Sequence, residues 1–122
     1  VDICNVGGIT ESMKVAGWCE SHYIDMMPHN PLGPICTAAS IHFGASVPNF
    51  AWLETRESAA ENAGFTNDEI IKSSHYMENA MYVVSKEPGL GISVNEDYLK
   101  NSKFKQWDPP QLERNDGSVT NW

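Results

Sequence analysis

The sequence MPHNPLGPICTAASIHFGASVPNFAWLE, residues 27–54, decides the fold expected for this chain of 122 residues. Pro34 directly follows Gly33 and suits the first turn of a helix. The apolar face of that helix contains side chains that recur at helical spacing, namely Ile35, Ala38, Ala39, His42 and Phe43. Apolar segments at residues 23–27 and 50–53 flank the helix and read as strands. The sequence therefore predicts a strand–helix–strand unit around the PHN motif.

The residues upstream continue the same alternation. Residues 1–4 are a short apolar run that predicts another strand, and Thr10 is the predicted N-cap of an amphipathic helix that ends near His22. Strand, helix, strand, helix, strand is the order typical of an α/β fold with a parallel sheet. We therefore expect residues 1–56 to form an α/β part and residues 57–122 to form a separate, irregular tail.

The tail lacks this alternation. Residues 58–72 are polar and acidic, with some helical tendency. Residues 81–84 and 92–94 are predicted strands on either side of a Pro/Gly turn. Asn95 is the predicted cap of a short helix through Lys100.

Charge and composition exclude several classes of partner. The formal net charge is −8 and no basic run is present, so we expect no binding to nucleic acid or to an anionic membrane surface. No apolar stretch approaches the roughly 18 residues of a membrane-spanning helix. The four tryptophans are expected in a core or an interface rather than in a base-stacking surface.

The cysteines indicate a reducing compartment. Cys4, Cys19 and Cys36 are odd in number and form no CxxC pair, which argues against a disulfide framework or a zinc ribbon. We therefore expect reduced cysteines in a cytoplasmic protein. Nothing near Cys36 in the sequence would activate it as a nucleophile.

Three ionisable residues follow the predicted strands, each about one helix-plus-strand unit after the last: Asp2, His29 and Glu54. Because the carboxyl ends of parallel strands share one edge of a sheet, Asp2 and His29 are expected within hydrogen-bond reach. A carboxylate beside an imidazole fixes its tautomer, as a general base requires. A buried Glu54 facing them would stay protonated and donate to a developing oxyanion.

Spacing alone leaves a structural interpretation open. A histidine after a strand is commonly structural or solvated, and an aspartate there is commonly a turn residue. Among the other histidines, His42 is expected to pack in the helix face, whereas His22 and His75 are expected at the surface.

Five segments carry a family resemblance. The segments are DICNVGGITE (residues 2–11), MPHNPLGPICTAAS (27–40), VPNFAWLE (47–54), PGLGISVNEDYL (88–99) and DGSVTNW (116–122). Together they resemble the mandelate racemase/muconate lactonizing enzyme group of the enolase superfamily. Within that group the sequence is most similar to sugar-acid dehydratases of the galactonate dehydratase type.

The resemblance implies the last three strands of a (β/α)7β TIM-like barrel, followed by a C-terminal tail that packs on a capping domain. It assigns His29 as the general base, Asp2 as the residue that orients His29, and Glu54 as the stabiliser of the substrate carboxylate and enediolate. The implied reaction is Mg²⁺-dependent dehydration of an aldonate such as galactonate or gluconate. Loss of the alpha proton and the beta-hydroxyl gives a 2-keto-3-deoxy acid, which makes the family member a lyase.

The resemblance also implies what the chain lacks. The Mg²⁺ ligands of the family lie on upstream strands, so no metal ligand is expected in this chain, and the capping domain is also upstream. The expected partners are a small sugar acid, the remainder of the barrel with its capping domain, and further copies in a homo-oligomer. One departure from the pattern is Asn30, which leaves the subclass of acid open.

Two alternatives remain beside this interpretation. The first is a truncated, non-catalytic chain that serves as an interaction module. The second is a racemase or epimerase of the same superfamily, whose second base would come from an upstream strand.

Overall fold

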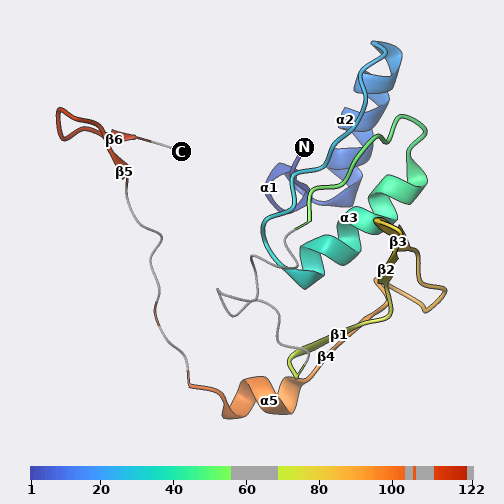
Figure 1. Ribbon diagram of the computed structural model, residues 1–122, viewed down its shortest axis with the longest axis vertical. Coiled ribbons are helices and arrows are strands. Elements are labelled where there is room, and N and C mark those ends of the chain that lie inside the picture. Colours follow the sequence, from blue (N-terminus) through green and yellow to red (C-terminus); the bar gives the residue numbers. More distant parts are fainter. Residues whose placement is uncertain (56–68, 104–105, 107–111, 121–122) are drawn as a thin grey trace.

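The computed structural model describes residues 1–55, 69–103, 106 and 112–120. Three helices come first and pack on one another, as Figure 1 shows in blue to green: α1 (Ile3–Val6), α2 (Ile9–Ser21) and α3 (Pro34–Ser46). The described residues that follow contain short strands and the helix α5: β1 (Ile71–Ser73), β2 (Tyr76–Glu78), β3 (Met81–Val83), β4 (Ile92–Val94), α5 (Glu96–Asn101), β5 (Leu112–Glu113) and β6 (Val119–Thr120).

The two long helices confirm the predicted ones. α3 begins at Pro34, and Ala38, Ala39 and Phe43 of its predicted apolar face are buried. Ile35 is about half exposed, so the predicted face is wrong at that position. α2 carries the acidic residue Glu11 in its first turn, but the predicted cap is wrong: Gly8, not Thr10, is the N-cap.

The predicted strand at residues 1–4 is wrong, because residues 3–6 form the helix α1. The Asp2 side chain accepts hydrogen bonds from the backbone N–H groups of Cys4 and Asn5 and so caps this helix. Gly7 ends it in the left-handed region, at a φ of 109°, and donates its N–H to Ile3 O. Local capping therefore outweighs the apolar character of this run.

The predicted strands at residues 23–27 and 50–53 are reduced to one parallel bridge, Met26 to Phe50. Met26 N–H donates to Asn49 O at 2.7 Å, and Ala51 N–H donates to Met26 O at 2.9 Å. The direction of pairing is parallel, as predicted, but residues 23–27 are not a buried strand, since only Met26 among them is buried. A parallel strand needs partners along its length, and the described residues supply only this bridge.

The strands after residue 69 form antiparallel pairs, β1 with β4 and β2 with β3. Asn79 and Ala80 connect β2 to β3 with φ values of 50° and 60°, which suits a two-residue hairpin turn. The predicted strands at residues 81–84 and 92–94 are confirmed as β3 and β4.

Two further expectations for the tail have different outcomes. The helical tendency within residues 58–72 was inferred from Ala59 and Ala60, which lie outside the described residues; at the end of that range, residues 71–73 form the strand β1. Asn95 does cap α5 by accepting from Tyr98 N–H at 3.0 Å, and the helix ends at Asn101, one residue later than predicted.

A small apolar core joins the elements. Its members come from the three helices α1, α2 and α3, from the segment between α2 and α3, and from the residue after α3: Ile3, Ala16, Met26, Ala39, Phe43 and Val47. Leu90, from the loop before β4, packs against this core and so attaches the tail to the helices. None of the helices in the described ranges has the length and apolar character needed to cross a membrane.

The histidines give a second attachment between the two parts. His42 packs its ring edge-on against His75, with ring centroids 5.1 Å apart, which confirms His42 as a packed residue. His75 is wrongly predicted as a surface group: it is buried, its Nε2 is 2.8 Å from Leu90 O, and its Nδ1 accepts from Ser85 N–H. His22 is exposed, as expected.

Candidate active site

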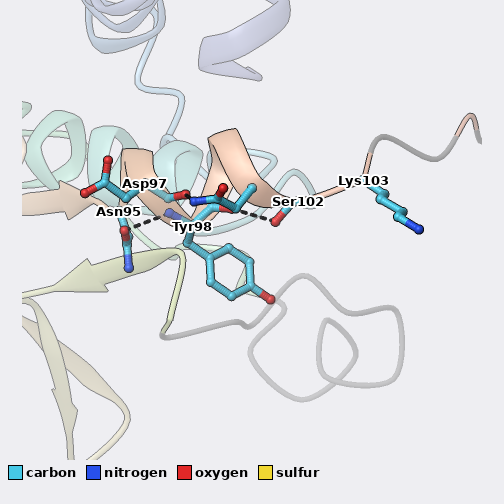
Figure 2. Close-up of a pocket in the computed structure, with 6 residues that line it drawn as sticks. Asn95, Asp97, Tyr98, Ser102 and Lys103 are labelled. Atoms are coloured by element: carbon cyan, nitrogen blue, oxygen red, sulfur yellow. Dashed lines mark hydrogen bonds between the residues drawn. The ribbon is translucent and has the colours of Figure 1, made fainter.

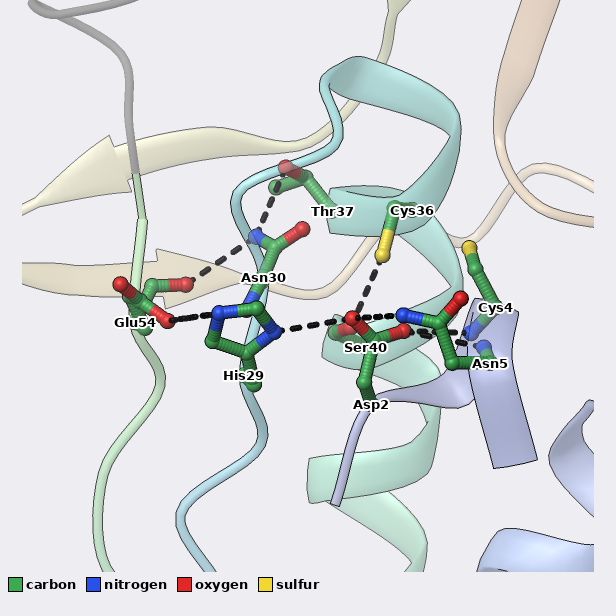
Figure 3. A network of polar contacts seen from close by, with 9 residues as sticks. All are labelled: Asp2, Cys4, Asn5, His29, Asn30, Cys36, Thr37, Ser40 and Glu54. Atoms are coloured by element: carbon green, nitrogen blue, oxygen red, sulfur yellow. Dashed lines mark hydrogen bonds and ion pairs between the residues drawn. The ribbon is translucent and has the colours of Figure 1, made fainter. Parts of the chain in front are cut away.

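The three residues predicted to form the site lie together. His29 Nδ1 is 2.8 Å from Asp2 Oδ2, and His29 Nε2 is 3.8 Å from Glu54 Oε2. Figure 3 shows the imidazole between the two carboxylates, with each ring nitrogen directed at one of them. The predicted contact between Asp2 and His29 is therefore present, and Glu54 lies on the other side of the ring.

Backbone hydrogen bonds place these side chains. His29 N–H donates to Val1 O at 2.8 Å, which ties the PHN loop to the residue before Asp2. Glu54 N–H donates to Pro28 O at 3.4 Å, so the segment that ends at Glu54 lies beside the same loop. The Met26–Phe50 bridge lies just upstream of both residues.

Asp2 is the least exposed of the three side chains, at 11%. Its partial burial alone would raise the pKa of the carboxyl group, but hydrogen bonds from His29 and from the backbone N–H groups of Asn5 and Cys4 lower the pKa below its ordinary value. An ionised carboxylate can only accept, so His29 Nδ1 must donate the hydrogen bond. In the neutral ring, this leaves the lone pair on Nε2, which faces Glu54.

Glu54 differs from the expectation of a buried acid, because its side chain is 42% exposed. Its Oε2 accepts a hydrogen bond from Asn30 N–H at 3.1 Å. The burial predicted for this carboxyl group is therefore not found among the described residues.

Asn30 is the positioning residue whose importance the sequence did not indicate. Its side chain is 1% exposed, and its Nδ2 donates both to Thr37 Oγ1 at 2.9 Å and to Glu54 O at 3.0 Å. The residue thus fastens the PHN loop to α3 and to the Glu54 segment. An asparagine directly after the histidine was visible as a departure from the family pattern, but its burial was not.

Cys4 and Cys36 were not predicted to lie near the site. One ligand atom from each of Asp2, Cys4 and Cys36 can be chosen so that all lie within 4.8 Å of one another. Burial, and after it the neighbouring Cys4 thiol, together raise the pKa of the Cys36 thiol to about 12. Mg²⁺ prefers oxygen ligands in an octahedral arrangement, so two thiols and one carboxylate do not fit it.

A depression lies beside α5, far along the chain from His29 (Figure 2). It has a volume of about 750 Å³ and is lined by exposed residues, namely Asn95, Asp97, Tyr98, Asn101, Ser102 and Lys103. Several of their polar groups bond within the helix and its caps, including Asn101 Nδ2 to Asp97 O and Ser102 Oγ to Tyr98 O. This depression offers no arrangement of groups comparable to that around His29.

Comparison with known proteins identifies the family. The family described as Enolase C-terminal domain-like matches residues 1–98. This chain belongs to that family, and its fold is of the α/β class. The resemblance inferred from the five segments is thereby confirmed.

The curated relatives that match this chain include a dehydratase. D-Galactonate dehydratase of Xanthomonas campestris pv. campestris (strain B100) is 33% identical over 125 residues, which cover 99% of this chain and 33% of that protein. The chain therefore spans about a third of the length of this relative.

Solved structures give the same family. A putative L-alanine-DL-glutamate epimerase from Burkholderia xenovorans strain LB400 matches with a TM-score of 0.66 and 30% identity, over 76% of this chain and 23% of that chain. An enolase from Pantoea ananatis with bound D-gluconate and Mg matches with a TM-score of 0.66 and 29% identity, over 79% and 22%.

Proposed function

We propose that this chain is the C-terminal part of a sugar-acid dehydratase that removes water from an aldonate such as galactonate or gluconate. Residues 1–56 would form the last part of the barrel and residues 57–122 a tail that packs on the barrel and its capping domain. The observation that carries the proposal is the imidazole of His29 held between the carboxylates of Asp2 and Glu54. The similarity to D-galactonate dehydratase and to a gluconate-bound structure supports the substrate class.

In this proposal His29 is the general base. Its Nε2 would take the proton from the carbon alpha to the substrate carboxylate, and the beta-hydroxyl group would then leave as water. Asp2 would stabilise the imidazolium that forms, since its carboxylate is 2.8 Å from Nδ1. A positioned base of this kind typically accelerates proton abstraction by about 100- to 10,000-fold.

Glu54 would stabilise the negative charge that develops on the substrate carboxylate. Glu54 would do so as a hydrogen-bond donor in a closed site, whereas its side chain is 42% exposed in this chain. The remainder of the barrel and the substrate itself would supply that cover. Asn30 would hold Glu54 in place through its bonds to Glu54 O and Oε2.

The metal would be held elsewhere. We propose that Mg²⁺ is bound by residues outside this chain, because the donor set beside Asp2 contains two thiols and does not fit it. The remainder of the barrel, the capping domain and further copies of the chain would be the partners, in a cytoplasmic homo-oligomer.

The proposal is tested by substituting the base in the complete protein. His29→Asn should reduce exchange of the substrate's alpha proton with deuterated solvent by at least about 100-fold, while metal binding is retained. His22→Asn is the matched control, since His22 is an exposed histidine outside the site. Exchange at the native rate in His29→Asn would show that His29 is not the base.

The similarity to a putative epimerase favours one alternative from the same superfamily. An epimerase would return the proton on the opposite face of the alpha carbon and keep the beta-hydroxyl group. Incubation of the complete protein with an aldonate in deuterated water separates the two. A 2-keto-3-deoxy product supports dehydration, whereas a deuterated epimer without loss of water supports epimerisation.

A further inference from the structure

The side chains of Cys4 and Cys36 meet beside Asp2, on the side of its carboxylate away from the His29 ring (Figure 3). Cys4 belongs to α1 and is exposed, whereas Cys36 belongs to α3 and is buried. The two helices pack on each other, so the two thiols are brought together by the fold rather than by a short sequence motif. The proposed dehydration uses neither thiol.

We propose that Cys4, Cys36 and Asp2 form a binding site for a soft divalent cation of the Zn²⁺ or Cd²⁺ type. Thiolates select soft and borderline cations, and a carboxylate oxygen is a common additional ligand for zinc. Three protein ligands leave the fourth tetrahedral position to solvent. The exposure of Cys4 provides a path by which the cation enters.

The distances suit this site after a small adjustment. Two sulfur ligands of a tetrahedral zinc ion, each about 2.3 Å from the metal, lie about 3.8 Å apart. The chosen donor atoms are within 4.8 Å of one another, so closing onto a cation requires movements of about 1 Å. Rotation of the exposed Cys4 side chain on the one-turn helix α1 can supply much of this movement.

Both thiols would bind as thiolates. The pKa of the Cys36 thiol is raised to about 12, first by burial, so this thiol is protonated in the metal-free protein at neutral pH. The bonds between a soft cation and sulfur offset the free-energy cost of deprotonating the thiol, and the proton is released to solvent on binding. Mg²⁺ forms no comparable bonds to sulfur and should not compete.

The site shares Asp2 with His29. Asp2 Oδ1 accepts from the backbone N–H groups of Cys4 and Asn5, and Oδ2 accepts from Asn5 Nδ2 and His29 Nδ1. These four bonds use the lone-pair positions of the carboxylate, so a cation bound to Asp2 must displace one of them. Loss of the His29 bond would inhibit the enzyme, and this consequence alone depends on the proposed function.

The test is a titration of the complete protein with Cd²⁺ in a reducing buffer that contains saturating Mg²⁺. Binding is read from the ultraviolet charge-transfer band between thiolate and cadmium, which requires no catalytic activity. The native protein should show this band. Cys4→Ser and Cys36→Ser should each weaken the binding at least about 10- to 100-fold, the effect expected for loss of even an outer partner of a metal site.

Cys19→Ser is the matched control, since Cys19 is the remaining cysteine and is not part of the cluster. It should bind Cd²⁺ as the native protein does. Because Cys36 is buried, Cys36→Ala is measured as well, with circular dichroism to verify that the variant is folded. Absence of the band in the native protein, or its persistence when both Cys4 and Cys36 are replaced, would overturn the proposal. If the band behaves as expected but Zn²⁺ does not inhibit, the site stands, and the cation has displaced one of the three other bonds to Asp2 rather than the bond from His29.

Discussion

Asp2 has two tasks that compete for one carboxylate. It caps α1 through the backbone N–H groups of Cys4 and Asn5, and it holds His29 through Nδ1. The same bonds lower its pKa below the ordinary value despite partial burial, so the carboxylate is ionised throughout the physiological range. Capping of α1 and orientation of His29 therefore depend on the same charge.

Asp2→Asn should make the free energy of unfolding less dependent on pH. A carboxyl group whose pKa is lower in the folded state than in the unfolded state contributes stability above the unfolded value, about 3.9, and loses it as the pH falls through the folded value. The native protein should therefore be more stable than Asp2→Asn near neutral pH, and the difference should shrink below about pH 4. Urea unfolding at several pH values measures both.

Asp25→Asn is the control for this comparison, because Asp25 is an exposed aspartate outside the site. It should follow the native protein at every pH. A stability difference between native protein and Asp2→Asn that stays constant down to about pH 2 would contradict the role given to the Asp2 charge.

For single residues, the sequence predicted that Asp2, His29 and Glu54 approach one another, but it did not predict all of the side chains that surround them. The spacing of Asp2 and His29 along alternating elements was enough to predict their hydrogen bond, which the structure contains. The roles of Asp2, His29 and Glu54 in catalysis stay predictions. Burial of Asn30 and the meeting of Cys4 with Cys36 depend on how α1 and α3 pack, and no local pattern in the sequence reports that.

At the scale of elements, helices were predicted better than strands. α2 and α3 each contain enough turns for apolar spacing, a proline start or an acidic first turn to identify them. The apolar run at residues 1–4 reads as a strand, yet residues 3–6 are helical, with the Asp2 carboxylate as the N-cap and Gly7 as the C-cap. Residues 23–27 read as a strand, but Tyr23 adopts a positive φ of 58° and only one bridge follows. Strand formation depends on partners that lie elsewhere in the chain, so a local pattern does not determine it.

Gly91→Ala should destabilise the pairing of β1 with β4. Gly91 has a φ of +64°, and an added Cβ would lie 2.8 Å from Ser74 Oγ, 3.0 Å from Ser85 Cβ and 3.1 Å from His75 Nε2. The left-handed backbone alone costs about 1–2 kcal/mol for a residue with a Cβ, and the crowding adds to this cost. Urea unfolding and hydrogen exchange of the Ser74 amide, which bonds to Gly91 O, measure the loss.

Gly89→Ala is a close control for that variant. Gly89 has nearly the same φ, +67°, but nothing lies within 4 Å of its added Cβ. Gly89→Ala should therefore lower the free energy of unfolding only by the backbone contribution of about 1–2 kcal/mol. Equal losses in the two variants would show that contact with His75 and the two serines contributes nothing.

At the scale of the whole molecule, the chain leaves large apolar side chains uncovered. Trp18 is 68% exposed and Trp52 is 72% exposed, so neither is a core residue, while Trp107 and Trp122 lie outside the described residues. Further exposed apolar side chains lie on the segments that carry His29 and Glu54, including Ile24, Met27, Leu32 and Phe50. Large exposed apolar surfaces commonly mark contacts with other polypeptide.

The isolated chain of 122 residues is therefore expected to be inactive. It spans about a third of the related dehydratase, whereas a full barrel takes about 250 residues. We expect no turnover of galactonate or gluconate, weak or absent binding of Mg²⁺, and self-association through the uncovered apolar side chains. Assay of the 2-keto-3-deoxy product, calorimetry with Mg²⁺ and light scattering measure these properties beside the complete protein. Turnover of any aldonate by the isolated chain would contradict the expectation.

The single bridge between Met26 and Phe50 has a consequence for the register of the two segments it joins. Successive side chains of an extended segment point to opposite faces. A slip of one residue would therefore turn Glu54 to the far face and leave Thr55 or Leu53 opposite the imidazole. Three backbone hydrogen bonds thus select which side chain His29 meets: Met26 to Asn49, Ala51 to Met26 and Glu54 to Pro28.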